Sequence, residues 1–249
     1  PVQGAGGVIV PPMSYFPKIQ AVLRKHDILM VADEVICGFG RTGQMFGCDT
    51  YGIKPDIMTV AKALSSSYLP ISATLVSAPI YEGLVKGSER NGAFSHGVTY
   101  AGHPVASAVA LETLKICEES NIVGHVQRMA PTFQARLAAL GSHPLVAGTR
   151  GVGLIGAIEI AQDKASKKTF DASSGVLARL SAAVLEHGLI TRALRDTMAL
   201  CPPLIITEPQ IHEMFDKLEH RCRQSGQHAT GCVEGLLGGF VLRNLDRTD

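Results

Sequence analysis

Two short apolar runs, each ending at a charged residue, constrain the fold of this chain more than any other feature. Residues 28–32 are continuously apolar and end at Asp33, and residues 57–61 are mostly apolar and end at Lys62. A continuous apolar run of this length is typical of a parallel strand that is covered on both faces. We therefore predict two buried, neighbouring strands whose carboxyl ends carry an acid and a lysine.

The segments around these runs alternate between strand-like and helix-like patterns, as in an α/β fold. Residues 7–10 resemble a short strand, residues 15–26 have helical apolar spacing, and residues 71–76 resemble a further strand. This pattern predicts a large domain at residues 1–120, built on a mostly parallel sheet. Its last helix is expected at residues 104–117.

From about residue 121 the pattern is that of a smaller α+β domain, which we assign to residues 121–220. Helices are expected at residues 122–140, 176–187 and 208–220. Strands are expected at residues 152–160, 189–191 and 198–200. The amphipathic pattern ends at Arg221. We expect residues 221–249 to form a poorly ordered or frame-altered tail.

Composition excludes several classes of protein. The 249 residues are 46% hydrophobic and 18% charged, which supports a packed core. A net charge of +1 without a basic block argues against nucleic-acid binding, and the apolar runs are too short to cross a membrane. Six cysteines without regular spacing are expected to be thiols of a cytoplasmic protein. The first residue is Pro1, so we interpret the chain as a fragment of a longer protein.

The two strand ends are the candidate site. In open α/β sheets, ligands bind beyond the carboxyl ends of the strands, where Asp33 and Lys62 are expected. A lysine at the end of a buried strand is partly desolvated, which lowers its pKa and frees the amine as a nucleophile. The alternatives are a Lys–Asp ion pair or a solvated lysine.

Several segments together resemble the class III aminotransferases, which use pyridoxal 5'-phosphate, and in particular their ω-amino acid:pyruvate branch. The similarity covers roughly residues 1–220 and implies part of a fold type I large domain followed by the smaller domain. It rests on motifs that occur in the expected order at residues 1–7, 32–43, 55–64, 96–104, 191–192 and 200–204.

The resemblance implies a role for each matching residue around the cofactor. Lys62 would bond to the cofactor aldehyde and then act as acid and base. Asp33 would pair with the pyridinium nitrogen, so that the ring stays protonated and accepts electrons. Val35 would pack on the ring face. Thr99 would bind the cofactor phosphate across the interface of a homodimer.

The resemblance also assigns the substrate contact. Arg192 would bind the substrate carboxylate with two parallel hydrogen bonds, for which guanidinium geometry is suited, and Arg195 is the alternative. The substrates would be an amine or ω-amino acid and a 2-oxo acid such as pyruvate. Other class III chemistry, such as an aminomutase or a different amino donor, and a catalytically dead fragment remain alternatives. Because the family's N-terminal half is missing, we expect weak cofactor binding and little activity from this chain alone.

Two other patterns predict no site. Residues 38–43 and 151–156 both match GxGxxG, but neither lies between a strand and a helix as a dinucleotide fingerprint must. His96 and His103 have no third ligand at a useful spacing, so we expect no metal.

Overall fold

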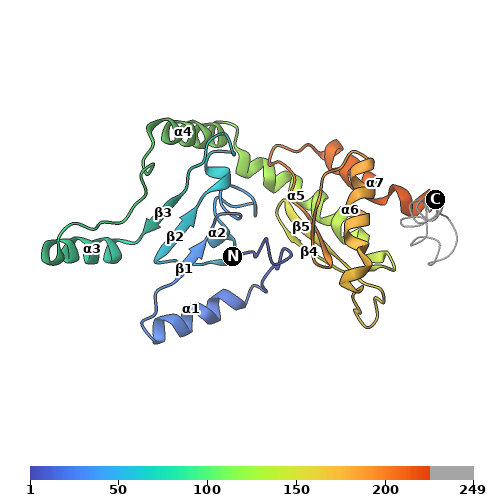
Figure 1. The fold of residues 1–249 in the computed structure, drawn as a ribbon, viewed down its shortest axis with the longest axis horizontal. Helices are drawn as coiled ribbons and strands as arrows, with labels where there is room; N and C mark the ends of the chain where they lie inside the picture. The colour runs from blue at the N-terminus through green and yellow to red at the C-terminus, as the bar shows by residue number, and fades with distance from the viewer. Residues whose placement is uncertain (225–249) are drawn as a thin grey trace, which may run out of the picture. The chain divides into compact units, whose positions relative to one another are not determined.

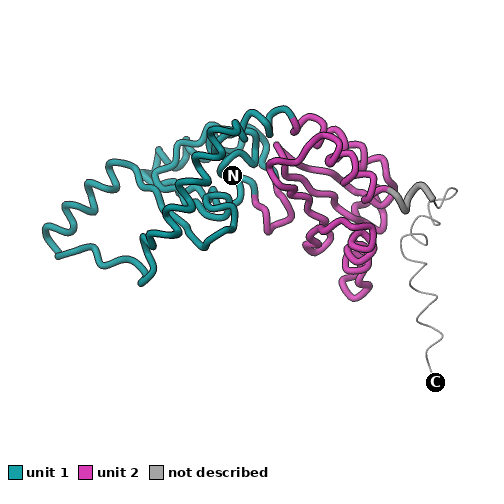
Figure 2. The backbone as a smooth tube through the Cα atoms, turned by 90° about the horizontal axis from the view of Figure 1, so that it is seen from above, with its two compact units in different colours: residues 1–2, 10–128 teal, residues 3–9, 129–249 magenta. Residues whose placement is uncertain are grey.

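The computed structural model describes residues 1–224, with side chains as far as residue 219. Contacts between residues divide the chain into two compact units (Figure 2). Unit 1 consists of Pro1–Val2 and Val10–Arg128, and unit 2 of Gln3–Ile9 and the chain from Met129 onward. The chain therefore passes from unit 1 into unit 2 and back within its first ten residues.

Unit 1 contains a three-stranded sheet in the order β1-β2-β3 (Figure 1). Strand β1 (Val31–Asp33) pairs in parallel with β2 (Ile57–Val60), which pairs antiparallel with β3 (Ala73–Val76). A small core on this sheet joins buried Phe39, Val60, Leu64 and Ala110.

One helix of unit 1 begins with a proline at its first helical position. Helix α4 starts at Pro104, and the Nδ1 atom of His103 accepts a hydrogen bond from the amide of Ala106 at 3.4 Å. A proline at the first helical position loses no hydrogen bond, which favours this start. The helices are α1 (Tyr15–Lys25), α2 (Gly47–Tyr51), η1 (Lys62–Leu64), α3 (Ala78–Asn91) and α4 (Pro104–Glu119).

Unit 2 contains a four-stranded sheet in the order β4-β5-β7-β6, with antiparallel pairing throughout. The strands are β4 (Val146–Val152), β5 (Ile155–Ile160), β6 (Arg192–Leu194) and β7 (Thr197–Leu200). The accompanying helices are α5 (Ile122–Ala139), which begins in unit 1, η2 (Leu140–Ser142), η3 (Ala172–Ser174), α6 (Val176–Glu186) and α7 (Glu208–Gln224).

The core of unit 2 lies between α5, α7 and the sheet. The rings of Phe133 on α5 and Phe215 on α7 meet edge to face at 5.5 Å between centroids, and both are fully buried. A Cβ atom added to Gly156 on β5 would lie 3.2 Å from the Phe133 ring, so a glycine lets β5 approach α5.

The sheet predicted for residues 1–120 is not mostly parallel, because β1 pairs in parallel with β2 but β2 pairs antiparallel with β3. The run 28–32 is also not a buried strand: β1 covers only its end, and Ile28 and Leu29 are 54% and 57% exposed. A continuous apolar run indicates that both faces of a strand are suited to burial, but it does not determine which other segments pack against them. The described residues leave these side chains open.

Three local predictions also differ from the structure. Residues 7–10 form no strand: a turn at residues 4–7 precedes Ile9, which makes an isolated bridge to Gln3. Residues 152–160 belong to a β4–β5 hairpin that turns at Gly153 with φ +58°. Helix α7 continues to Gln224, into the range predicted as a tail, and residues 225–249 lie outside the described chain.

No helix among the described residues has the length and apolarity needed to cross a bilayer.

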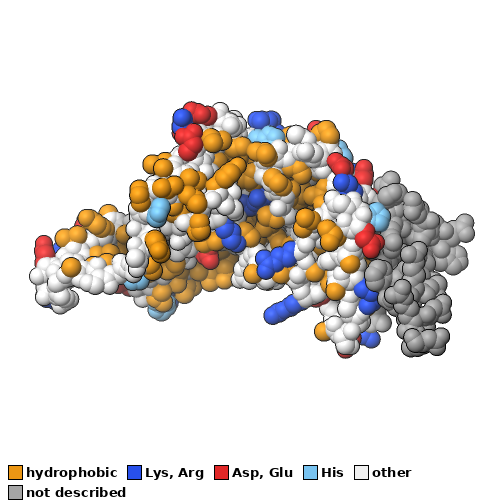
Figure 3. Space-filling model, turned by 45° about the horizontal axis from the view of Figure 1, so that its top comes forward, with side chains coloured by type: hydrophobic (Ala, Val, Ile, Leu, Met, Phe, Trp, Pro, Cys, Tyr) orange, Lys and Arg blue, Asp and Glu red, His pale blue; other side chains and the backbone are white. Residues whose placement is uncertain are grey.

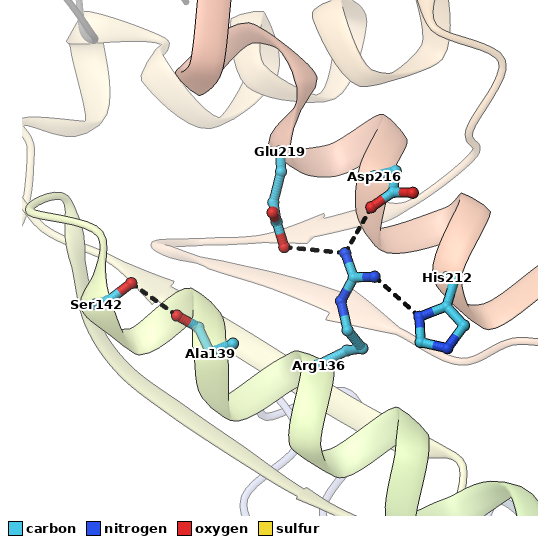
Figure 4. A network of polar contacts seen from close by, with 6 residues as sticks. All are labelled: Arg136, Ala139, Ser142, His212, Asp216 and Glu219. Carbon is cyan, nitrogen blue, oxygen red and sulfur yellow. Dashed lines mark hydrogen bonds and ion pairs between the residues drawn. The ribbon is translucent and has the colours of Figure 1, made fainter. Parts of the chain in front are cut away.

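Arg136 joins α5 to α7 at the edge of the unit 2 core (Figure 4). Its guanidinium donates to Asp216 at 2.8 Å and to Glu219 at 3.2 Å, and lies 3.0 Å from Nδ1 of His212. It also lies over the Phe215 ring, 5.6 Å from the centroid. Since the Arg136 side chain is 20% exposed, its contacts are less screened by water than those of a surface ion pair.

We expect Arg136→Ala to lower the free energy of unfolding by about 1–3 kcal/mol, because it removes charged hydrogen bonds and ring contact together. Arg128→Ala, an exposed position on the same helix, serves as the control and should change stability by less than about 0.5 kcal/mol. Urea unfolding followed by circular dichroism measures both. Equal midpoints for the two variants would contradict this account of the network.

Candidate active site

Asp33 and Lys62 lie at the same edge of the unit 1 sheet. Strands β1 and β2 run in parallel with Asp33 opposite Thr59, and the amide of Glu34 donates to the carbonyl of Thr59 at 2.9 Å. Lys62 follows just beyond the end of β2, and the side chains of Asp33 and Lys62 are both exposed. The parallel pairing therefore presents a carboxylate and an amine at one strand edge, as the sequence predicted.

The backbone at Lys62 is in the left-handed region, with φ +47°. Ser66 and Ser67 share this conformation, with φ +48° and +65°. Residues other than glycine rarely adopt it, at a cost of order 1–3 kcal/mol each, and such positions cluster at functional sites. The turn is held by buried Ser65, whose hydroxyl donates to the carbonyl of Leu69 at 2.6 Å. The lysine is thus delivered by a tightly specified turn.

The Asp33 carboxylate is oriented by its own backbone. Its Oδ1 atom accepts a hydrogen bond from the amide of Val35 at 3.0 Å, as in an Asx turn. Within the described chain Oδ2 has no hydrogen-bond donor. One oxygen therefore fixes the carboxylate while the other is available to a protonated ring nitrogen. Val35, half-buried, follows in the same turn.

The partly desolvated setting predicted for Lys62 is not present in the described residues, since the side chain is exposed and only Val60 of β2 is buried. The chemistry of the donor set nevertheless fits pyridoxal phosphate. An amine at this edge can bond to its aldehyde, and a carboxylate at the same edge can pair with its ring nitrogen. Asp33 and Lys62 are the residues that would hold it.

The other predicted site residues lie apart from this edge in the chain. Thr99 is exposed in the segment between α3 and α4. Arg192 is the exposed first residue of β6 in unit 2, and Arg195 follows in the β6–β7 turn with φ +55°. A pocket of about 550 Å³ also belongs to unit 2, where it lies against α7 and includes Ile190 and Cys201. It contains neither Asp33 nor Lys62.

Sequence reasoning missed Glu34, which is completely buried beside Asp33 and bonds to the start of α2. The signal was available, because side chains alternate across a strand and an exposed Asp33 implies a buried neighbour. It also missed Arg150, for which the sequence gives no signal. The Nε atom of Arg150 donates to the carbonyls of Gly7 and Val8 at 2.8 and 3.2 Å.

Arg150 fastens residues 3–9 to the sheet of unit 2. Its terminal nitrogens bond to Glu159 at 3.2 Å and to the hydroxyl of Thr197 at 3.0 Å, so the guanidinium is held on several sides. The attached segment includes Val8, which is buried with φ +55°. A β-branched residue in this conformation is an outlier that only surrounding contacts can maintain.

The other features noted in the sequence are the cysteines, the histidines and the GxGxxG matches. Cys37, Cys48, Cys117 and Cys201 are free thiols, and burial raises the pKa of Cys37 and of Cys48. No group of three or more His, Cys, Asp or Glu side chains among the described residues could hold a metal ion. The GxGxxG match at residues 151–156 forms the β4–β5 hairpin, where a dinucleotide fingerprint requires a helix.

These features define an α/β chain that presents a lysine and an acid at the carboxyl edge of a parallel strand pair. Residues 1–221 match the family model described as aminotransferase class-III. The chain belongs to the class III aminotransferase family, whose members use pyridoxal phosphate.

Curated relatives include a probable γ-aminobutyrate transaminase 3, mitochondrial, from rice (Oryza sativa subsp. indica), which is 50% identical over 217 residues. That match covers 87% of this chain and 42% of the relative. The γ-aminobutyrate transaminase 1, mitochondrial, of tomato (Solanum lycopersicum) is 50% identical over 215 residues, with 86% and 42% coverage. The chain thus spans less than half the length of these curated relatives.

Solved structures agree with this assignment. A structure described as a transaminase with L-alanine superposes with a TM-score of 0.88 at 44% identity, covering 96% of this chain and 54% of its own. An ω-transaminase from Pseudomonas jessenii in complex with PMP superposes with a TM-score of 0.87 at 47% identity, covering 96% and 51%.

We expect Arg150→Met to release residues 3–9, because it keeps the apolar stem but removes every donor to Gly7 and Val8. Proteinase K should then cleave within this segment roughly tenfold faster than in the unchanged chain. Mass spectrometry of the early fragments measures the rate. Arg90→Met, at an exposed position of unit 1, is the control. Unchanged cleavage in Arg150→Met would show that other contacts hold the segment.

Proposed function

We propose that the protein containing this chain is a pyridoxal-phosphate-dependent transaminase. It would move an amino group from an amine or ω-amino acid to a 2-oxo acid such as pyruvate. The observation that carries the proposal is the shared carboxyl edge of β1 and β2, which bears both Asp33 and Lys62 in a class III chain. When bound, pyridoxal phosphate supplies an aldehyde and a ring that accepts the electron pair released at the substrate carbon.

The residues of the chain would supply binding, orientation and proton transfer. The Nζ atom of Lys62 would bond to the cofactor. It would later take the proton from the substrate carbon that carries the amino group, which requires a neutral amine, and deliver it to the carbon that was the cofactor aldehyde. The Oδ2 atom of Asp33 would accept a hydrogen bond from the ring nitrogen and favour its protonated form. Val35 would contact the ring face, and Thr99 of a second copy the phosphate.

The substrate class is supported by the relatives and by one arginine. γ-Aminobutyrate, named in the plant relatives, is an ω-amino acid, and removal of the amino group from L-alanine leaves pyruvate. Arg192 would bind the substrate carboxylate through its planar fork of donors.

The cellular compartment is a separate proposal: the cysteines favour the cytoplasm, whereas the plant relatives are named mitochondrial or chloroplastic. Fluorescent tagging of the full-length protein decides between them.

A homodimer is the proposed assembly. Unit 1 exposes many apolar side chains, since α3 has no buried residue and every residue of β3 is exposed. Figure 3 shows such side chains along the arm formed by α3 and its flanking segments. An exposed apolar surface marks a site of protein contact, and a second copy that brings Thr99 to the cofactor phosphate would cover part of it.

Lys62 should be the residue that bonds to the cofactor. After incubation with substoichiometric pyridoxal phosphate and reduction with borohydride, we expect the cofactor mass on the peptide that contains Lys62. Lys62→Ala should lose this label, whereas Lys54→Ala, which removes another exposed lysine of unit 1, should retain it. Peptide mapping by mass spectrometry measures the labelling. An even spread over the exposed lysines would favour the alternative of a catalytically dead chain.

The dimer proposal predicts a difference between two exposed apolar positions. Tyr81 on α3 is 62% exposed and Leu185 on α6 of unit 2 is 57% exposed. Tyr81→Asp should shift the chain towards the monomer by placing a charge in the interface, with an increase in dissociation constant of roughly tenfold. Leu185→Asp should leave assembly unchanged. Sedimentation velocity at several concentrations measures both, and equal behaviour of the two variants would exclude α3 from the interface.

A further inference from the structure

Glu34 lies between Asp33 and Val35 and is 0% exposed. Its carboxylate accepts two hydrogen bonds from successive amides, with Oε2 at 2.9 Å from the nitrogen of Gly47 and Oε1 at 2.6 Å from that of Cys48. These amides open α2, so a single side chain connects the end of β1 to a helix that starts thirteen residues later. Both carboxylate oxygens are thereby occupied within the protein.

The backbone of Glu34 is fixed as firmly as its side chain. Its amide donates to the carbonyl of Thr59 on β2 at 2.9 Å, and its carbonyl accepts from the amide of Gly38 at 2.9 Å. A Cβ atom added to Gly38 would lie 2.9 Å from that carbonyl oxygen, which leaves no room for any other side chain. Glu34 therefore ties β2, the following loop and α2 to one point.

Asp33 and Val35 take their orientation from this fixed point. Ala32 and Glu34 are buried while Asp33 is exposed, as alternation along a strand requires. A rotation of the backbone at Glu34 would turn both neighbours and break the hydrogen bond between the Val35 amide and Asp33 Oδ1. The buried carboxylate of Glu34 thus holds the exposed carboxylate of Asp33 in place indirectly.

We propose that Glu34 is a positioning residue: through Gly47 and Cys48 it keeps Asp33 directed at the cofactor's ring nitrogen. The inference rests on the proposed function of Asp33. Gln20 offers a matched comparison, because this buried side chain also bridges two backbone groups of unit 1. Its Nε2 donates to the carbonyl of Gly52 at 3.0 Å, and its Oε1 accepts from the amide of Lys54 at 2.9 Å. Those contacts lie at the other end of α2.

The first test needs no cofactor. Glu34→Gln keeps the side-chain volume but points a donor at one of the two amides. We expect amide hydrogen exchange, followed by NMR on the whole chain, to be roughly tenfold faster at Gly47, Cys48 and Val35. Gln20→Ala should accelerate exchange at Lys54 and leave Val35 unchanged. Faster exchange at Gly47 and Cys48 with an unchanged Val35 would overturn the proposal, because Glu34 would then hold only the loop.

The second test follows the bound cofactor through the pH dependence of its absorbance. Loss of a carboxylate beside a pyridinium nitrogen lowers the pKa of that nitrogen, so Asp33→Asn should move the transition to lower pH. Glu34→Gln should move it in the same direction, Gln20→Ala should not, and the double variant should match Asp33→Asn alone. Additive shifts, or none in Glu34→Gln, would overturn the proposal.

The two tests separate failure of this inference from failure of the proposed function. If Lys62 takes up no cofactor, the proposed function fails, while hydrogen exchange at Val35 still decides whether Glu34 positions Asp33. Should Glu34→Gln not fold, Glu34→Asp replaces it. The shortened carboxylate should raise exchange at Val35 by a smaller factor, and an unchanged rate in the folded variant would again overturn the proposal.

Discussion

The parallel pairing of β1 with β2 is the contact on which the candidate site depends. Side chains at the carboxyl ends of two parallel strands reach the same edge, whereas antiparallel pairing would send them to opposite edges. Asp33 sits opposite Thr59 in this register, and the chain turns at Lys62 directly afterwards. A short strand pair is thereby sufficient to place a carboxylate and an amine from segments separated in sequence at the same edge of the sheet.

Much of this edge could be predicted from the sequence, because its signals are local. The ends of the apolar runs marked Asp33 and Lys62, and helical spacing located α4, α5, α6 and α7 to within a few residues. The motifs at residues 32–43 and 55–64 predicted the family that the comparisons then established. Chemistry carried by short motifs is readable because the residues that perform it are close in the chain.

The failed predictions concern properties that depend on distant residues. The apolar character of Ile28 and Leu29 predicted burial, but burial depends on what covers a side chain, and the described residues leave both exposed. Strand direction depends in the same way on which segment pairs with which. The role of Arg150 could not be predicted, since no local sequence pattern indicates a hydrogen bond to the carbonyl of Gly7, 143 residues away. The burial of Glu34 was readable from alternation, but its hydrogen bonds to Gly47 and Cys48 were not.

The placement of residues 3–9 also fixes the order in which parts of the chain can fold during translation. During translation these residues leave the ribosome long before Arg150 and Thr197, the side chains that later secure them. The flanking residues of unit 1 are by then already available to fold, since domains generally form as they emerge. Residues 3–9 therefore stay unattached until Arg150 and Thr197 have been synthesised, and unit 2 can reach its final form only then.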